Sequence, residues 1–122
     1  MKITLNYIYV TIEGDYYQVC FDEKEDDGST EITDDPYFLI QRQFEMPDGG
    51  EIYIESHDRN YIGHFKVKEM ILQRDKFTIE LKRPKFSYIE ISFNSTENKF
   101  NKLRNALKMM VPNYKEKLLR NI

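Results

Sequence analysis

The sequence predicts an α+β domain: a mostly antiparallel sheet of about six to seven strands, built as a meander of hairpins, with one C-terminal amphipathic helix packed on it. Apolar and polar residues alternate with a period of two in several short segments, and turn residues separate these segments. A helical period occurs only at about residues 95 to 111. With 122 residues and 40% hydrophobic content, the chain has the size of one domain with one modest core, so we expect residues 1 to 122 to form a single unit.

The first predicted hairpin lies in residues 3 to 21. β-forming residues alternate from Ile3 to Val10, and the alternation resumes at Tyr17, Val19 and Phe21 after a turn at residues 14 and 15. Two strands joined by so short a turn pair in antiparallel fashion. This segment therefore predicts the first two strands of the sheet.

An acidic loop is predicted between the hairpins, at residues 22 to 35. Eight acidic residues and one lysine surround a glycine and a serine there, a composition that stays solvated. A calcium loop is a poor match, because Glu23 and Asp34 replace the Asp and the bidentate Glu that begin and end such a loop, and because strands flank the segment. The predicted partner-binding site consists of the acidic residues and the tyrosine that follows them: Asp22, Glu23, Glu25, Asp26, Asp27, Glu31, Asp34, Asp35 and Tyr37.

The second predicted hairpin comprises residues 37 to 44 and 51 to 57, with a turn rich in proline and glycine between them. Arg42 stands out because it shares a strand face with apolar residues. The expected turn places Arg42 opposite Glu55, and a slip of one residue places it opposite Ile54. We interpret Arg42 as one half of a cross-strand ion pair, and binding of an anionic group or of a partner carboxylate is the alternative.

Three more strands are predicted after the second hairpin. The first runs from Tyr61 to about residue 73, and a change of its apolar phase near residues 68 and 69 predicts a β-bulge there. A turn at residues 74 and 75 separates it from the next strand. The apolar residues expected to face the core from the last two strands are Phe77, Ile79, Leu81, Ile89, Ile91 and Phe93.

The helix is predicted at about residues 95 to 111. Asn94 and Glu97 have the spacing of a capping box, with Asn in place of Ser or Thr, and the helix ends before Pro112. The tail, residues 113 to 122, either adds a helical turn or frays. The apolar stripe that we expect to pack on the sheet consists of Phe100, Leu103, Leu107 and Met110.

The charge of the chain is split between its two halves. Residues 1 to 58 hold 15 acidic and 3 basic residues, a net charge of −12, whereas residues 59 to 122 hold 6 acidic and 15 basic residues, a net charge of +9. Such a separation of charge indicates how the protein could attract binding partners, and it does not predict the fold. No apolar run approaches the roughly 20 residues that cross a bilayer, and no export signal is visible. One cysteine permits no internal disulfide, so we expect a cytoplasmic protein without membrane contact.

His57 and His64 are the residues considered for a metal or small-ligand site. Glu55 and Asp58 lie near them in sequence, but the spacing matches no common ligand signature, and Cys20 does not supply a further zinc ligand. Histidines at strand ends that bond to backbone or carboxylate groups are the simpler interpretation. Cys20 lies inside a predicted strand and is interpreted as a packing residue rather than a nucleophile. We therefore expect no catalytic residue, metal or cofactor, and no enzymatic activity.

Nucleic-acid binding is suggested only by the basic half of the chain. The total charge of −3 and the pI of about 5.4 argue against it, because nucleic-acid-binding domains are usually basic overall. The cations expected on adjacent strands are Lys66, Lys68, Arg74, Lys76, Lys82, Arg83 and Lys85.

Several strand patterns between about residues 37 and 111 together resemble a known family. The matching segments are Tyr37-Phe-Leu-Ile-Gln-Arg, Glu51-Ile-Tyr-Ile-Glu, Ile71-Leu-Gln-Arg, Phe77-Thr-Ile-Glu-Leu and Ile89-Glu-Ile-Ser-Phe, followed by Phe100, Leu103 and Leu107. They resemble the immunity protein 10 family of bacterial polymorphic-toxin systems, and the run that ends in Gln41-Arg42 is the most distinctive. The resemblance implies a small cytoplasmic protein that binds a cognate toxin and blocks it, without catalysis of its own.

Our leading hypothesis is an immunity protein whose acidic loop docks against a basic surface of a toxin, such as a nuclease domain, with neighbouring aromatics such as Tyr37 adding most of the affinity. A second hypothesis is a self-associating structural domain, for example a homodimer, in which the acidic half meets the basic half of another copy. A third is a small ligand- or metal-binding domain that uses His57, His64 and Arg42.

Overall fold

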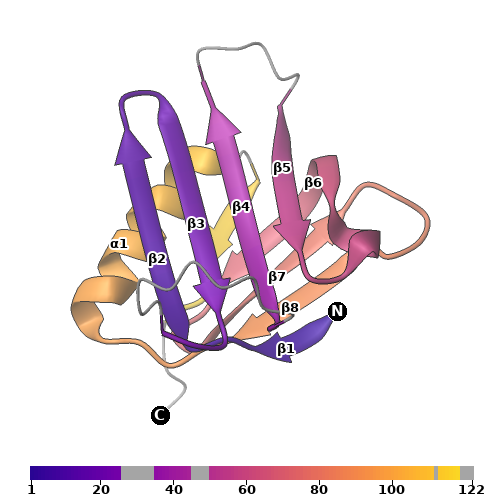
Figure 1. The fold of residues 1–122 in the computed structure, drawn as a ribbon. Helices are drawn as coiled ribbons and strands as arrows, with labels where there is room; N and C mark the ends of the chain where they lie inside the picture. Colours follow the sequence, from indigo (N-terminus) through magenta and orange to yellow (C-terminus); the bar gives the residue numbers. More distant parts are fainter. Residues whose placement is uncertain (26–34, 45–49, 112, 119–122) are drawn as a thin grey trace.

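The predicted α+β class is confirmed in a computed structural model, which describes residues 1–25, 35–44, 50–111 and 113–118. Within these residues a mostly antiparallel, open sheet of nine strands packs against a single helix (Figure 1). The strands are β1 (Lys2–Thr4), β2 (Tyr7–Glu13), β3 (Tyr16–Asp22), β4 (Tyr37–Gln43), β5 (Glu51–Ser56), β6 (Gly63–Leu72), β7 (Lys76–Leu81), β8 (Tyr88–Ser92) and β9 (Tyr114–Glu116). A short 3-10 helix, η1 (Arg59–Tyr61), precedes β6, and the α-helix is α1 (Glu97–Met110).

β6 belongs to both halves of the sheet. Its first residues pair with β5, from Gly63 opposite Ile54 to Lys66 opposite Glu51, and its later residues pair with β7. The predicted bulge is confirmed, because the register of β6 against β7 shifts between Val67 and Glu69. In Figure 1, β2 to β5 cross in front of β7 and β8. The sheet therefore bends at β6 and forms two layers.

β9 and β1 are the short strands that the sequence pattern did not predict. β9 pairs in parallel with Met70–Leu72 of β6, so it occupies the edge that β5 leaves when the sheet bends. The expected continuous strand from Ile3 to Val10 is wrong, because β1 pairs with β8 and β2 pairs with β3. Leu5 and Asn6 make this crossing: Leu5 is fully buried and donates its N–H to the Ser92 carbonyl at 2.9 Å, and the Asn6 side chain accepts from the Asn94 N–H at 3.0 Å.

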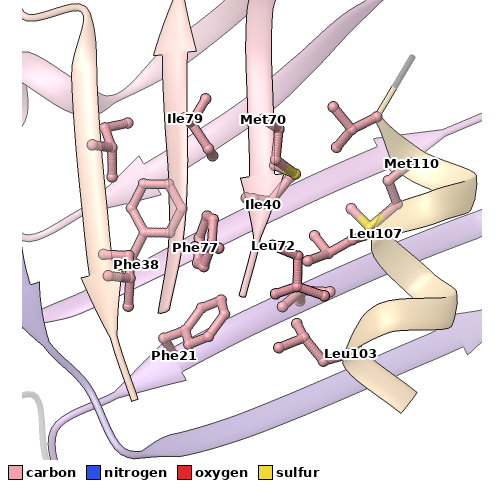
Figure 2. Close-up of a cluster of buried hydrophobic side chains, with 14 of the residues drawn as sticks. Phe21, Phe38, Ile40, Met70, Leu72, Phe77, Ile79, Leu103, Leu107 and Met110 are labelled. Carbon is pink, nitrogen blue, oxygen red and sulfur yellow. The ribbon is translucent and has the colours of Figure 1, made fainter. Parts of the chain in front are cut away.

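The hydrophobic core lies between the two layers. Phe77 of β7 has its ring centroid 4.9 Å from that of Phe21 and 6.0 Å from that of Phe38, which come from the opposite layer. Figure 2 shows these rings together with Leu103 and Leu107 of α1. Since all five side chains are fully buried, the aromatic contact joins the layers and the helix into one core.

Helix α1 begins two residues later than the predicted capping box requires. Thr96, not Asn94, is the N-cap, and its hydroxyl accepts a hydrogen bond from the Lys99 N–H at 3.2 Å. Asn94 instead takes part in the crossing between layers, where its N–H donates to the Asn6 side chain. Among the described residues, no helix has the length and apolar character needed to cross a membrane. The predicted stripe is buried together with Ala106: Phe100, Leu103, Leu107 and Met110.

β9 is held to α1 by an ionic network around Glu116. Arg104 donates to both oxygens of the Glu116 carboxylate, at 2.7 and 3.0 Å, and the Tyr114 hydroxyl donates to it at 2.6 Å. The Arg104 guanidinium is the largest cause that lowers the pKa of Glu116 from 4.5 to about 2. Residues 114 to 116 of the tail thus form a strand instead of the expected helical turn or frayed end, and residues 119 to 122 lie outside the described residues.

Two adjacent methionines test the packing of α1. Met110 is fully buried, whereas Met109 is 58% exposed. We expect Met110→Ala to lower the free energy of unfolding by about 2 to 5 kcal/mol, because it leaves a cavity in the core. The matched control Met109→Ala should change it by less than about 0.5 kcal/mol. Urea unfolding followed by circular dichroism measures both values, and equal effects would contradict the packing described above.

Glu116 should contribute stability that depends on pH. Its folded-state pKa is depressed, so the contribution is complete above the unfolded pKa of about 4.5 and is lost as the pH falls toward about 2. The difference in free energy of unfolding between the wild type and Glu116→Gln should therefore be largest above pH 4.5 and shrink toward pH 2. Glu69→Gln is the charge-matched control, because the Glu69 carboxylate contacts Lys115 only at 3.9 Å and at an exposed site. A difference that stays constant across this range would rule out the ionic network as its source.

Candidate functional site

The outer face of β3, β4 and β5 points toward the viewer in Figure 1, and no described helix or strand lies in front of it there. Strand alternation sends one set of side chains into the core and the other set to this face. The pairing places Cys20 opposite Leu39 and Leu39 opposite Glu55, while Asp22 lies opposite Tyr37. Residues of three strands that are far apart in sequence are therefore neighbours on this face.

Two tyrosine hydroxyls hold the Glu55 carboxylate in place. Tyr37 donates to Glu55 Oε2 at 3.1 Å, and Tyr53 donates to Oε1 at 3.0 Å. Burial, followed by the hydrogen bond to Glu55, raises the pKa of Tyr37 to about 12. Because each carboxylate oxygen retains further acceptor capacity, Glu55 can still accept from a cationic donor of a partner. We call Cys20, Asp22, Tyr37, Tyr53 and Glu55 the tyrosine–carboxylate cluster.

Cys20 takes part in this cluster as a weak donor. Its Sγ lies 3.6 Å from Asp22 Oδ2, and it is a free cysteine of intermediate exposure. Burial is the first cause, and the Asp22 carboxylate the second, that raises the pKa of the thiol to about 12. The thiol therefore stays protonated at neutral pH, so this arrangement does not supply the thiolate that nucleophilic catalysis needs.

The ends of the acidic loop lie next to the cluster. The described loop residues are Asp22, Glu23, Lys24, Glu25 and Asp35, and Asp22 and Tyr37 are directly paired where the loop leaves and rejoins the sheet. The Glu23 N–H donates to the Pro36 carbonyl at 3.4 Å, and Lys24 Nζ lies 3.4 Å from Asp35. Both contacts close the base of the loop. The other predicted site residues, Asp26, Asp27, Glu31 and Asp34, lie outside the described residues.

The two histidines make separate local contacts. His57 Nδ1 lies 3.2 Å from both the backbone N and the backbone O of Tyr37, and the ring of His64 packs 5.2 Å from that of Tyr53, its cross-strand partner. In the described part of the chain, no group of three or more His, Cys, Asp or Glu residues could hold a metal ion. His57 thus contacts the backbone of Tyr37, and His64 contacts the ring of Tyr53, at two separate places beside the tyrosine–carboxylate cluster.

The predicted ion pair between Arg42 and Glu55 is wrong. The observed register pairs Gln41 with Tyr53, so Arg42 lies beyond Glu55, and strand alternation turns it to the opposite, inner face. There its Nη1 donates to the Met110 carbonyl at 2.7 Å, and its guanidinium lies 4.5 Å from the ring centroid of Phe44. The last carbonyls of a helix lack intrahelical donors and carry partial negative charge, which explains why a cation is stable at this position. Arg42 is thus separated from His57 and His64, and the structure does not bring these three residues into one site.

Most of the basic residues considered for nucleic acid are engaged within the chain. Lys68 lies 3.3 Å from Glu80, Arg74 lies 3.0 Å from Glu97, and Lys76 lies 4.0 Å from Glu90. Arg83 donates to the Asn60 carbonyl at 3.2 Å and stacks 4.8 Å from the ring centroid of Phe65. Carboxylates are therefore interleaved with the cations on this side of the molecule, and the surface is not a continuous basic stripe.

Tyr53 and its role were missed in the sequence, and Glu55 was considered only as a partner of Arg42 or of a metal. The signal that could have identified them is the alternation in residues 51 to 56, which puts Tyr53 and Glu55 on the same face as Tyr37 once the hairpin register is known. No family model, curated protein or solved structure matches this chain in sequence or fold.

The hydrogen bond between Tyr37 and Glu55 can be tested through the pKa of Tyr37. We expect the pKa of Tyr37 to be about 12, and we expect Glu55→Gln to lower it without returning it to 10, because burial remains as the largest cause. NMR titration of the tyrosine ring carbons measures both values. Tyr16 is the internal control, since burial and Glu13 raise its pKa, so Glu55→Gln should leave it unchanged. An unchanged pKa of Tyr37 in Glu55→Gln would mean that the two groups do not interact.

Proposed function

We propose that this chain is a non-catalytic immunity protein that binds and neutralises a cognate toxin domain, with the tyrosine–carboxylate cluster and the adjoining acidic loop as its docking surface. The observation that supports this most directly is the Glu55 carboxylate, fixed by two tyrosine hydroxyls on an uncovered sheet face. The resemblance of residues 37 to 111 to the immunity protein 10 family is consistent with this role.

The proposed docking surface combines two kinds of interaction. Carboxylates at the loop ends, such as Glu23 and Glu25, create a negative potential that raises the association rate with a basic partner. Tyr37 and Tyr53 provide large and already ordered side chains, the residue type that most often dominates binding energy at interfaces. A toxin domain that acts on nucleic acid has a basic surface, which makes it a partner of suitable charge.

The direct test is protection from killing. A gene beside that of this chain is first sought that encodes a large secreted protein with a variable C-terminal domain. The chain is then co-expressed in bacteria with that C-terminal domain, and survival is counted with and without induction. Rescue by the wild-type chain is the expected result. Continued killing, with the chain present in folded form at a level above that of the toxin domain, would refute the pairing.

The docking surface is tested by measuring the binding kinetics of the chain with the toxin domain against which it protects the cells. Asp22→Asn combined with Glu55→Gln should slow association by about three- to tenfold at low salt and flatten its salt dependence, because the steering charge is reduced. Tyr37→Ala should speed dissociation by about tenfold or more, because it removes an anchor. Surface plasmon resonance at several salt concentrations measures both rates.

The matched control for charge is Asp75→Asn combined with Glu69→Gln, which removes two carboxylates from the other layer. This variant should associate and dissociate like the wild type. If instead it slows association as much as the cluster variant does, the effect comes from net charge, and the assignment of the docking surface is wrong while the immunity role stands.

A further inference from the structure

β2 is the last strand of the sheet on the side of the acidic half. It pairs with β3 through all seven of its residues, and no described strand pairs with its other edge. Such an edge presents unpaired backbone N–H and C=O groups to any chain that can extend the sheet. The edge of β2 is therefore a surface that backbone hydrogen bonds could recognise.

The register identifies the residues whose backbone points to this edge. Glu13 and Tyr16 close a turn of two residues, so they form a hydrogen-bonded pair, and the hydrogen-bonded pairs then recur at every second residue of β2. Ile8, Val10 and Ile12 lie between these pairs. Their N–H and C=O groups consequently point away from β3, toward the free edge.

Helix α1 forms the second wall of a groove along this edge. The groove has a volume of about 280 Å³, and its walls are four consecutive residues of β2, Ile8 to Thr11, together with Lys99 and Lys102. The two lysines are separated by three residues, so they lie on the same side of the helix. Lys99 reaches across the edge, and its Nζ lies 5.9 Å from the ring centroid of Tyr9.

Both lysines can pair with an incoming acidic group. Among the described residues, the ion pairs of α1 use Glu97, Arg104 and Lys108, and none of them involves Lys99 or Lys102. A lysine beside a strand edge repels basic segments and attracts acidic ones. The groove thus combines backbone hydrogen-bonding groups with a positive charge on one wall.

We propose that the free edge of β2 binds an extended acidic segment of a partner protein, which adds as a further strand while its carboxylates pair with Lys99 and Lys102. β2 lies next to Cys20 and Asp22 of the tyrosine–carboxylate cluster, but the edge described here is on its other side, and the proposal does not depend on the immunity role. A second copy of the chain fits the groove less well. Antiparallel pairing of two β2 edges about Val10 would bring the lysines of both copies to one axis, where like charges repel.

The test uses synthetic peptides of about eight residues, a length within the usual range for strands. In the acidic peptide Glu alternates with Thr and Val, and in the basic peptide Lys replaces every Glu. A third peptide keeps the acidic sequence but is N-methylated on the residues that would face β2. NMR titration and amide hydrogen exchange of the full chain report binding at Ile8, Val10 and Ile12.

The expected result is that the acidic peptide shifts and protects these amides, whereas the basic and N-methylated peptides do not. Lys99→Glu combined with Lys102→Glu should weaken binding of the acidic peptide by at least about tenfold and permit binding of the basic peptide, because two charges are reversed. Lys82→Glu combined with Lys85→Glu makes the same charge change on exposed residues outside the groove and should leave binding within about twofold of the wild type.

Three outcomes would overturn the proposal. Protection of the β2 amides without peptide, together with a dimer in sedimentation, would assign the edge to a second copy. Equal binding of the acidic and N-methylated peptides would mean that charge alone, not strand addition, causes the contact. If none of the three peptides shifts the NMR signals of these amides, β2 does not bind a further strand, and the lysines only prevent pairing at this edge.

Discussion

The fold depends on one strand that serves two layers. β6 pairs with β5 through its first residues and with β7 through its later residues, and the register shift between Val67 and Glu69 separates the two regions. The bend has three consequences. It brings the apolar faces of β2–β5 and β6–β8 together around Phe77. It opens the edge of β6 that β9 occupies, and it leaves the inner side of β2 and β3 to pack against α1.

Most strands of the two layers come from halves of the sequence that have opposite net charge. β2 to β5 come from residues 1 to 58, whose net charge is −12, and β6 to β9 and α1 come from residues 59 to 122, whose net charge is +9. Among the described residues, the buried core between the layers contains no charged side chain, so the charged residues of each layer lie at its surface. The tyrosine–carboxylate cluster belongs to the negative layer, and the lysines of the groove belong to the helix of the positive half.

The pattern of neighbouring residues was sufficient to predict most of the strands and the helix. The elements that it missed depend on contacts between residues far apart in the sequence. The hairpins, the bulge and the stripe of α1 follow from alternation and helical period, which are properties of adjacent residues. β1 and β9 have only three residues each, and their parallel partners are supplied by distant segments. The partner of Arg42 was missed because the length of the β4–β5 connection sets the register, and because the helix C-terminus that it meets is 68 residues away. The cluster needed the same register, since Tyr37 and Glu55 become neighbours only when it is known.

The pairing of β1 with β8 determines the order in which the molecule can be completed. Lys2 lies opposite Glu90, so β1 can pair with β8 only after a further 88 residues (90 − 2) have been synthesised. During this interval the apolar side of β2–β5 also lacks Phe77 and α1, although the hairpins themselves can form early. A chain synthesised only as far as β5 therefore exposes a hydrophobic sheet face, the kind of surface through which incomplete chains aggregate.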